Sequence, residues 1–249
     1  MRRFVLFLPL IAACSGCPVW QSQDVPVPAT LVKEQITGTR YWRYVPKDYT
    51  PQRRWPMVVT LHGTIPYDTY ENQIDEWKRL AENKQFIVVA PYLHSTQGIL
   101  PVVSKFWFED LERDEKAILA IIDEMCKTHS IDKKAIMLHG FSAGGFPLFY
   151  TGLRNPQRFN MLVARGTNCR IELLESINIT DEMRKLPVII LIGKDDSPVI
   201  QKQCWLAFRY LRERRCFETQ RHEFEGGHLR RPDLAYTYWR QHLPEQYRK

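Results

Sequence analysis

The chain has 249 residues, of which 44% are hydrophobic and 25% are charged, and its formal net charge is +7 at neutral pH. These values are typical of a globular protein with one buried core, and the absence of repeats excludes a repeat or low-complexity protein. The positive charge is compatible with nucleic acid, but no nucleic-acid-binding motif accompanies it. We therefore expect a single folded domain without a nucleic-acid partner.

The N-terminus has the order of a bacterial export signal. Met1-Arg2-Arg3 is basic, an apolar stretch follows, and Ile11-Ala12-Ala13-Cys14 fits the cleavage site of a lipoprotein. The apolar stretch is too short to span a bilayer. We expect residues 1–13 to be removed and Cys14 to be lipidated, with ordinary cleavage near Ser15 or Gly16 as the alternative. The predicted location is periplasmic or cell-surface, on a bacterial membrane, with a secreted soluble protein as the alternative.

Residues 14–35 are predicted to form a tether, because Gln21–Pro28 alternates polar residues with valine and proline. The folded domain is expected at residues 36–249, and contact with a membrane is expected through the lipid anchor only. The cysteines show no metal-ligand spacing, so no metal is expected. One disulfide is compatible with an oxidising compartment, but its pairing stays open.

Strand-like apolar runs and helical periodicity alternate along the domain. Strands are predicted at residues 40–45, 57–61, 86–90, 135–138, 161–164, 187–192 and 217–224, and helices at 70–82, 110–128, 146–153, 198–214 and 232–242. This alternation predicts an α/β fold with a mainly parallel sheet and helices on both faces. Ligands of such sheets bind beyond the carboxyl ends of the strands.

The predicted strand at 57–61 ends in His62-Gly63-Thr64. A backbone N–H at such a strand end can donate to negative charge that develops on the oxygen of a bound carbonyl group, called an oxyanion. Thr64 is the predicted donor, although a single His-Gly pair is weak by itself.

Phe106-Trp107-Phe108 precedes the long predicted helix at 110–128. Trp107 is a candidate for an aromatic wall that binds a ring or a sugar of the substrate. Packing of these aromatic residues in the core is the alternative.

A Gly-x-Ser-x-Gly motif, Gly140-Phe141-Ser142-Ala143-Gly144, stands between a predicted strand and a predicted helix. This context predicts a nucleophile elbow, in which Ser142 is exposed on a sharp turn. Gly140 and Gly144 permit the turn, because a Cβ at either position would crowd the strand and the helix. Ser142 is the predicted nucleophile, and the backbone N–H of Ala143 is the second predicted oxyanion donor.

A serine nucleophile also needs a carboxylate and a histidine, in the chain order Ser, Asp or Glu, His. The buried-type strand at 187–192 ends in Gly193 and is followed by Asp195 and Asp196, and a Gly-Gly pair precedes His228. Asp196 is favoured as the acid, and the other aspartate would be a turn or cap residue. His228 is the predicted base, because the Gly-Gly pair makes a turn that can bring its imidazole over the sheet edge, whereas His222 lies inside the preceding strand.

Together these motifs resemble the α/β-hydrolase superfamily, and within it the small secreted esterases of the feruloyl-esterase and polyhydroxybutyrate-depolymerase-like group. The matching pieces lie within about residues 36 to 243 and are Arg43–Tyr49, Leu61–Gly63, Gly140–Gly145, Gly193–Asp196 and Gly226–His228. In that group the acid commonly stands third after the strand-ending glycine, which supports Asp196. The chain departs from the better-studied depolymerases, since it lacks an obvious extra substrate-binding or linker domain.

The sequence thus predicts a serine carboxylic-ester hydrolase that needs no cofactor and acts on short acyl or aryl esters, including esters on carbohydrate. The interval between the strands at 161–164 and 187–192 has scarcely room for a helical lid, so a minimal fold with an open pocket is expected. A serine peptidase of the same fold and a non-catalytic binding lipoprotein are the alternatives. The oligomeric state stays open.

Overall fold

The computed structural model describes residues 28–96, 101–215 and 217–248. The predicted signal peptide, Cys14 and the first part of the predicted tether lie outside these residues. No helix within the described ranges has the length and apolarity needed to cross a membrane. Three cysteines, Cys126, Cys169 and Cys204, are free thiols.

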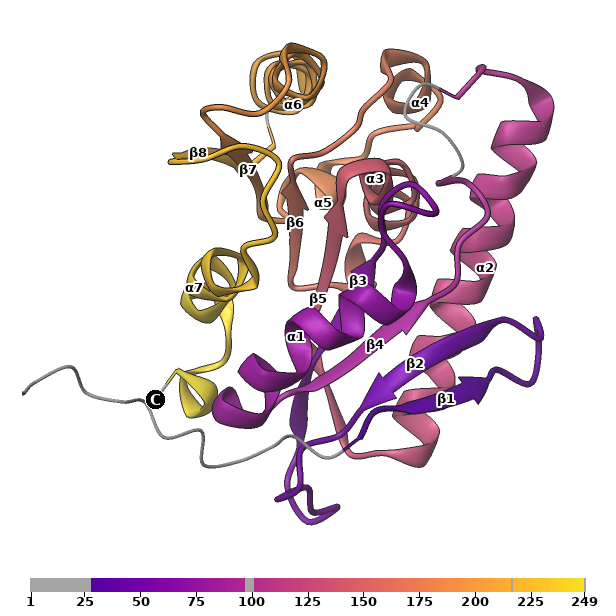
Figure 1. Cartoon of the computed structure of the whole chain (residues 1–249), viewed down its shortest axis with the longest axis vertical. Coiled ribbons are helices and arrows are strands. Elements are labelled where there is room, and N and C mark those ends of the chain that lie inside the picture. Colours follow the sequence, from indigo (N-terminus) through magenta and orange to yellow (C-terminus); the bar gives the residue numbers. More distant parts are fainter. Residues whose placement is uncertain (1–27, 97–100, 216, 249) are drawn as a thin grey trace, which may run out of the picture.

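An eight-stranded sheet in the order β1-β2-β4-β3-β5-β6-β7-β8 forms the centre of the described chain (Figure 1). The strands are β1 Thr30–Lys33, β2 Arg40–Tyr44, β3 Trp55–Leu61, β4 Ile87–Pro91, β5 Ile131–Phe141, β6 Met161–Arg165, β7 Val188–Gly193 and β8 Thr219–Phe224. Strands β3 to β8 pair in parallel, whereas β1 and β2 form an antiparallel edge. All the parallel strands therefore present their carboxyl ends at one edge of the sheet.

Helices connect most of the strands. They are α1 Tyr70–Lys84, α2 Lys105–Thr128, α3 Gly145–Arg154, α4 Ile171–Glu175, α5 Asp181–Arg184, α6 Pro198–Arg209 and α7 Pro232–His242. A π-helix, η3 Tyr210–Arg214, continues α6, and 3-10 turns lie at η1 Ser142–Gly144, η2 Pro156–Arg158 and η4 Glu245–Tyr247.

Successive residues of the buried strands point into two different cores, as the period of two in a strand requires. Met57 and Val59 of β3 belong to a core with α2, α3 and α6, while Val58 belongs to a core with α1 and α7. Helices α1 and α7 lie side by side on one face of the sheet (Figure 1). Because both faces are covered, the central strands are continuous apolar runs.

The predicted fold class, a mainly parallel sheet covered by helices on both faces, is confirmed. One boundary needs correction, because Thr30–Lys33 were expected in the tether and instead form β1, which pairs with β2. This strand is short and largely exposed, so it has no buried apolar run that could have identified it. The interval between β6 and β7 holds only the short helices α4 and α5.

Candidate functional site

Ser142 lies at the sharp turn where β5 passes into η1 and α3. Its φ is +53°, a value that residues other than glycine seldom adopt. The turn is possible because two glycines flank it. A Cβ on Gly140 would lie 2.5 Å from the carbonyl oxygen of Gly144, and a Cβ on Gly144 would lie 2.4 Å from that of Leu61. The local geometry is that of a nucleophile elbow.

His228 and Asp196 meet through a hydrogen bond of 2.8 Å between Nδ1 and Oδ2. The Asp196 side chain is 1% exposed, and its Oδ1 accepts a second hydrogen bond, of 2.7 Å, from the Ser197 N–H. An ionised carboxylate can only accept, so Nδ1 of His228 carries the proton and Nε2 is left able to take one up. Asp195 is exposed, and of the two aspartates the structure pairs Asp196 with the histidine.

The loops that carry these two residues are held together at the end of β7. The Asp195 N–H donates to the Gly226 carbonyl at 2.9 Å, and a Cβ on Gly193 would lie 2.1 Å from the Gly227 carbonyl oxygen. The imidazole of His228 also stacks on the ring of Phe141, the residue before Ser142, with 4.6 Å between centroids. A backbone contact and an aromatic contact thus bring His228 to the elbow.

Ser142 and His228 line one cavity of about 600 Å³. Its other lining residues include Thr64, Tyr67, Asp68, Asp195, Ile200 and Arg230. In this arrangement the hydroxyl of Ser142 donates to Oδ1 of Asn168 at 3.4 Å, and the Asn168 N–H donates to the Ser142 carbonyl at 2.9 Å. Catalytic hydrogen bonds are often incomplete without substrate, so this geometry is compatible with a Ser142 hydroxyl that turns to donate its proton to the imidazole.

The loop after β3 lies directly against the elbow. A Cβ on Gly63 would be 3.0 Å from the Cβ of Ser142, and the neighbouring Thr64 lines the cavity. His62 is buried beneath this loop: its Nδ1 lies 2.8 Å from the Gly63 carbonyl, and its Nε2 accepts from the Leu93 N–H at 3.0 Å. Because Nε2 accepts a hydrogen bond, it carries no proton, so the ring is neutral and Nδ1 donates. Burial lowers the pKa of His62, which favours the same neutral form.

The contact with His62 has a consequence for the next peptide N–H. Since a trans peptide is planar, fixing the Gly63 carbonyl also fixes the Thr64 N–H, which points the opposite way. Ala143, the other predicted donor, is fully buried next to Ser142. The structure thus places Thr64 and Ala143 beside the serine.

Trp107 does not lie at the substrate cavity, where it was expected to form an aromatic wall. It is 6% exposed, packs edge-to-face on Phe146 at 5.3 Å between centroids, and donates Nε1–H to the Ser95 carbonyl at 3.3 Å. These contacts belong to the core between α2 and α3, and Trp107 is not among the residues of the cavity. The expected aromatic wall is therefore wrong, and core packing is what the structure shows.

Four residues at the site were missed by sequence reasoning: Tyr67, Asp68, Asn168 and Arg230. Tyr67 is 81% exposed and supplies an aromatic side chain at the cavity. Asn168 stands just after β6, so the rule that ligands bind beyond strand ends would have pointed to it. No local pattern marks Tyr67, Asp68 or Arg230.

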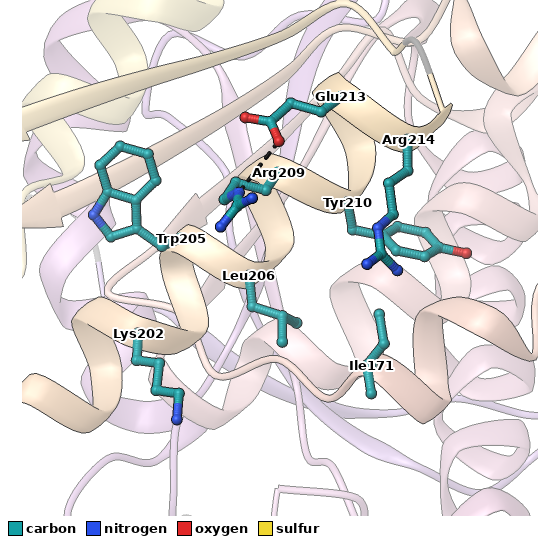
Figure 2. Close-up of a pocket in the computed structure, with 8 residues that line it drawn as sticks. All are labelled: Ile171, Lys202, Trp205, Leu206, Arg209, Tyr210, Glu213 and Arg214. Carbon is teal, nitrogen blue, oxygen red and sulfur yellow. Dashed lines mark hydrogen bonds and ion pairs between the residues drawn. The ribbon is translucent and has the colours of Figure 1, made fainter.

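Two further features of the described residues bear on ligands. No group of three or more His, Cys, Asp or Glu in residues 28–96, 101–215 and 217–248 is arranged to hold a metal ion. A second groove, of about 390 Å³, lies along α6 and η3, where Figure 2 shows Lys202, Arg209 and Arg214 around Leu206. It shares no lining residue with the cavity at Ser142.

Comparison with known proteins begins with the fold. No family model matches the chain. The solved structure of a CE1 ferulic acid esterase from Anaeromyces mucronatus, in complex with ferulic acid, superposes with a TM-score of 0.66 at 17% identity, covering 88% of this chain and 90% of that one. The protein described here has the α/β-hydrolase fold.

Of the four curated proteins that match part of the sequence, two are at least 30% identical to it. A bifunctional acetylxylan esterase/xylanase from Neocallimastix patriciarum is 31% identical over 113 residues, which are 45% of this chain and 16% of that protein. Poly(3-hydroxyalkanoate) depolymerase C from Paucimonas lemoignei is 30% identical over 153 residues, 59% of this chain and 34% of that protein. The chain thus matches about a third or less of these relatives. The resemblance to this group of hydrolases, indicated by the motifs, is confirmed.

Proposed function

We propose that this protein is a serine carboxylic-ester hydrolase that cleaves short acyl or aryl esters, including esters on carbohydrate, through an acyl-enzyme on Ser142. The observation that carries the proposal is the hydrogen bond between Asp196 and His228 at a cavity that also contains Ser142 on its strained turn. A binding module needs neither a serine held at positive φ nor an imidazole oriented by a buried carboxylate.

In the first half of the reaction, the Ser142 hydroxyl turns from Asn168 towards Nε2 of His228. The imidazole accepts its proton while Oγ attacks the ester carbonyl carbon. Asp196 keeps the proton on Nδ1 and stabilises the imidazolium that forms. The backbone N–H groups of Thr64 and Ala143 donate to the oxyanion.

Collapse of the tetrahedral intermediate breaks the bond to the alcohol oxygen, which receives the proton from Nε2 of His228. Water then enters, and Nε2 removes its proton as the water oxygen attacks the acyl carbon. The second intermediate collapses, Ser142 regains its proton, and the carboxylic acid leaves.

The choice of substrate class is supported by the surroundings of the cavity. Only the short helices α4 and α5 lie between β6 and β7, and one aromatic residue that lines the cavity, Tyr67, is exposed. An open cavity suits a small acyl group on a larger alcohol better than a long acyl chain. Proteins similar to this one are named for acetylxylan and ferulic acid, whose acyl groups are acetyl and the aryl-substituted feruloyl.

We further propose that the enzyme is exported and anchored by lipid at Cys14. This proposal rests on the order of the basic, apolar and cleavage-site residues at the N-terminus. The residues between Cys14 and β1 would then separate the catalytic domain from the membrane surface.

A panel of p-nitrophenyl esters, aryl-sugar esters and peptide amides tests the proposal. We expect turnover of the esters and a loss of about 10⁴-fold or more in Ser142→Ala, the range for removal of a triad nucleophile. A fluorophosphonate probe should label the parent but not this variant. Cleavage of the amides without the esters would indicate a peptidase, and a parent without turnover or labelling would indicate a binding protein.

A further inference from the structure

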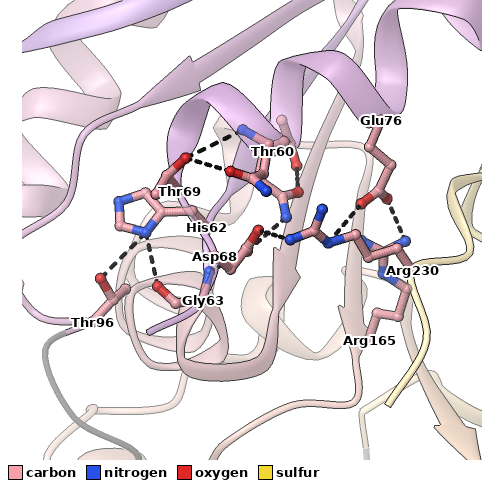
Figure 3. A network of polar contacts seen from close by, with 11 residues as sticks. Thr60, His62, Gly63, Asp68, Thr69, Glu76, Thr96, Arg165 and Arg230 are labelled. Carbon is pink, nitrogen blue, oxygen red and sulfur yellow. Dashed lines mark hydrogen bonds and ion pairs between the residues drawn. The ribbon is translucent and has the colours of Figure 1, made fainter. Parts of the chain in front are cut away.

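The buried carboxylate of Asp68 belongs to one loop of the site and contacts a second loop. We call residues 62–69 the oxyanion loop and residues 225–231 the histidine loop. Within the oxyanion loop, Oδ2 of Asp68 accepts from the Gly63 N–H at 2.6 Å. Its Oδ1 accepts from Nη2 of Arg230 in the histidine loop at 2.7 Å. Figure 3 shows both contacts converging on this side chain, which is 4% exposed.

The contact with Arg230 belongs to a set of four charges that balance. Glu76 of α1 lies 3.8 Å from Nε of Arg230, measured to Oε2, and forms an ion pair with the fully buried Arg165 (Figure 3). Burial raises the pKa of Glu76, while Arg165 and Arg230 oppose that rise. Two carboxylates and two guanidiniums thus compensate one another, so removing one partner leaves an uncompensated buried charge.

A directed chain of hydrogen bonds reaches Asp68 from the other side. Nε2 of Gln73 donates to Oδ2 of Asp68 at 2.8 Å, and Oε1 of Gln73 accepts from the Thr60 hydroxyl at 2.6 Å. Thr60 has then used its one proton, so it accepts from Nδ1 of His139 at 2.9 Å. Every donor along this chain points towards Asp68, whose carboxylate therefore has a fixed orientation.

We propose that Asp68 is a positioning residue that clamps the oxyanion loop to the histidine loop. Through Gly63 it holds the backbone that leads to the Thr64 N–H, and through Arg230 it holds the loop that carries His228. The inference rests on the proposed function, because it assigns these two loops to the oxyanion and to the base. Misplacement of a catalytic group by about 1 Å can cost about 10²-fold in rate, which is why such a clamp matters.

The kinetic test uses Asp68→Asn, Arg230→Met and the double variant, with p-nitrophenyl acetate as substrate. We expect each single substitution to lower kcat about tenfold or more per active site, with KM changed by less than about twofold. The loss in kcat of the double variant should be no larger than that of the less active single variant, because both substitutions break the same link. Arg230→Lys keeps a charged donor and should lose less than Arg230→Met.

The neighbouring Arg231 provides a matched control. Its side chain is 34% exposed, as is that of Arg230, but it pairs with Asp233 at 2.7 Å rather than with the oxyanion loop. Arg231→Met should therefore leave kcat within about twofold of the parent. Active sites are counted by endpoint titration with a fluorophosphonate, so that a lower yield of folded protein is not read as a lower kcat.

Hydrogen exchange followed by mass spectrometry tests the clamp without relying on activity. Asp68→Asn should speed exchange in the histidine loop, and Arg230→Met should speed it in the oxyanion loop, whereas Arg231→Met should leave the oxyanion loop unchanged. The clamp would be overturned if a substitution in one loop left exchange in the other loop unchanged. It would also be overturned if the losses in kcat multiplied in the double variant, or if kcat stayed unchanged in single variants whose melting temperature fell. If the variants show these changes in exchange but the parent hydrolyses no ester, the clamp would stand and the proposed function would be contradicted. If Asp68→Asn does not fold, kcat and exchange in the oxyanion loop are compared among Arg230→Met, Arg230→Lys and Arg231→Met, and this comparison still tests the clamp.

Discussion

Replacing Asp196 by asparagine should impair the proposed reaction far more than the same change at Asp195. Both carboxylate oxygens of Asp196 accept from N–H groups, one from His228 and one from Ser197. An asparagine has one oxygen and one NH₂ group, so it cannot accept at both positions. If its NH₂ faces the imidazole, the ring must carry its proton on Nε2 and cannot act as the base. If its NH₂ faces Ser197, two donors are opposed in a buried place.

The size of the effect follows from these two arrangements. A buried donor left without an acceptor costs about 1–3 kcal/mol, and the variant also loses the negative charge that stabilises the imidazolium. In an unrelated serine protease, the equivalent change to asparagine gives the wrong tautomer and lowers kcat about 10⁴-fold, which corresponds to about 5 kcal/mol in the barrier. We expect a loss of this order for Asp196→Asn.

The assay compares kcat for p-nitrophenyl acetate in the parent, Asp196→Asn and Asp195→Asn, with circular dichroism to verify the fold. Asp195 is exposed, so its substitution should leave kcat within about threefold of the parent. Equal losses in the two variants, or a larger loss in Asp195→Asn, would refute the assignment of the acid and the reasoning from the hydrogen-bond geometry.

Two further predictions concern stability and location. Burial lowers the pKa of His62 and lowers that of His139 well below its ordinary value. Below about pH 6.5 the unfolded chain therefore binds more protons than the folded chain. As the pH decreases, the free energy of unfolding should fall by up to about 1.4 kcal/mol per pH unit for each ring. Urea unfolding at pH 7 and pH 5 measures this fall, which should be smaller in His139→Gln; an equal fall in both proteins would show that His139 is not responsible. If Cys14 carries lipid, the parent should partition with membranes and incorporate labelled palmitate, and Cys14→Ser should release fully active enzyme. A parent that is soluble and unlabelled would leave ordinary secretory cleavage as the explanation.

The sequence by itself determined the features that are local in the chain. The central strands are buried on both faces, so they are continuous apolar runs that can be recognised one at a time. The elbow is equally local, because its turn depends on two glycines within two residues of Ser142. The alternation of strands and helices then implied a parallel sheet whose carboxyl ends share one edge.

Contacts between distant segments were decided only by the tertiary structure. The sequence places two aspartates side by side after β7, and His228, 32 residues beyond Asp196, selects one of them through a hydrogen bond. Trp107 and Phe106 are neighbours as well, but the start of α2 at Lys105 turns Trp107 into the core and leaves Phe106 76% exposed. Neither local propensity nor a motif predicts which aspartate pairs with His228 or which aromatic residue is buried, because each outcome depends on what packs against the segment.

Asp68 shows the same limit most fully. Its partners Gly63 and Gln73 are each five residues away, whereas Arg230 is 162 residues away. An isolated aspartate before a helix is an ordinary polar residue in the sequence. Only when the sheet brings the loops after β3 and β8 together does its carboxylate become buried, and burial makes its pairing with a guanidinium a requirement of the fold.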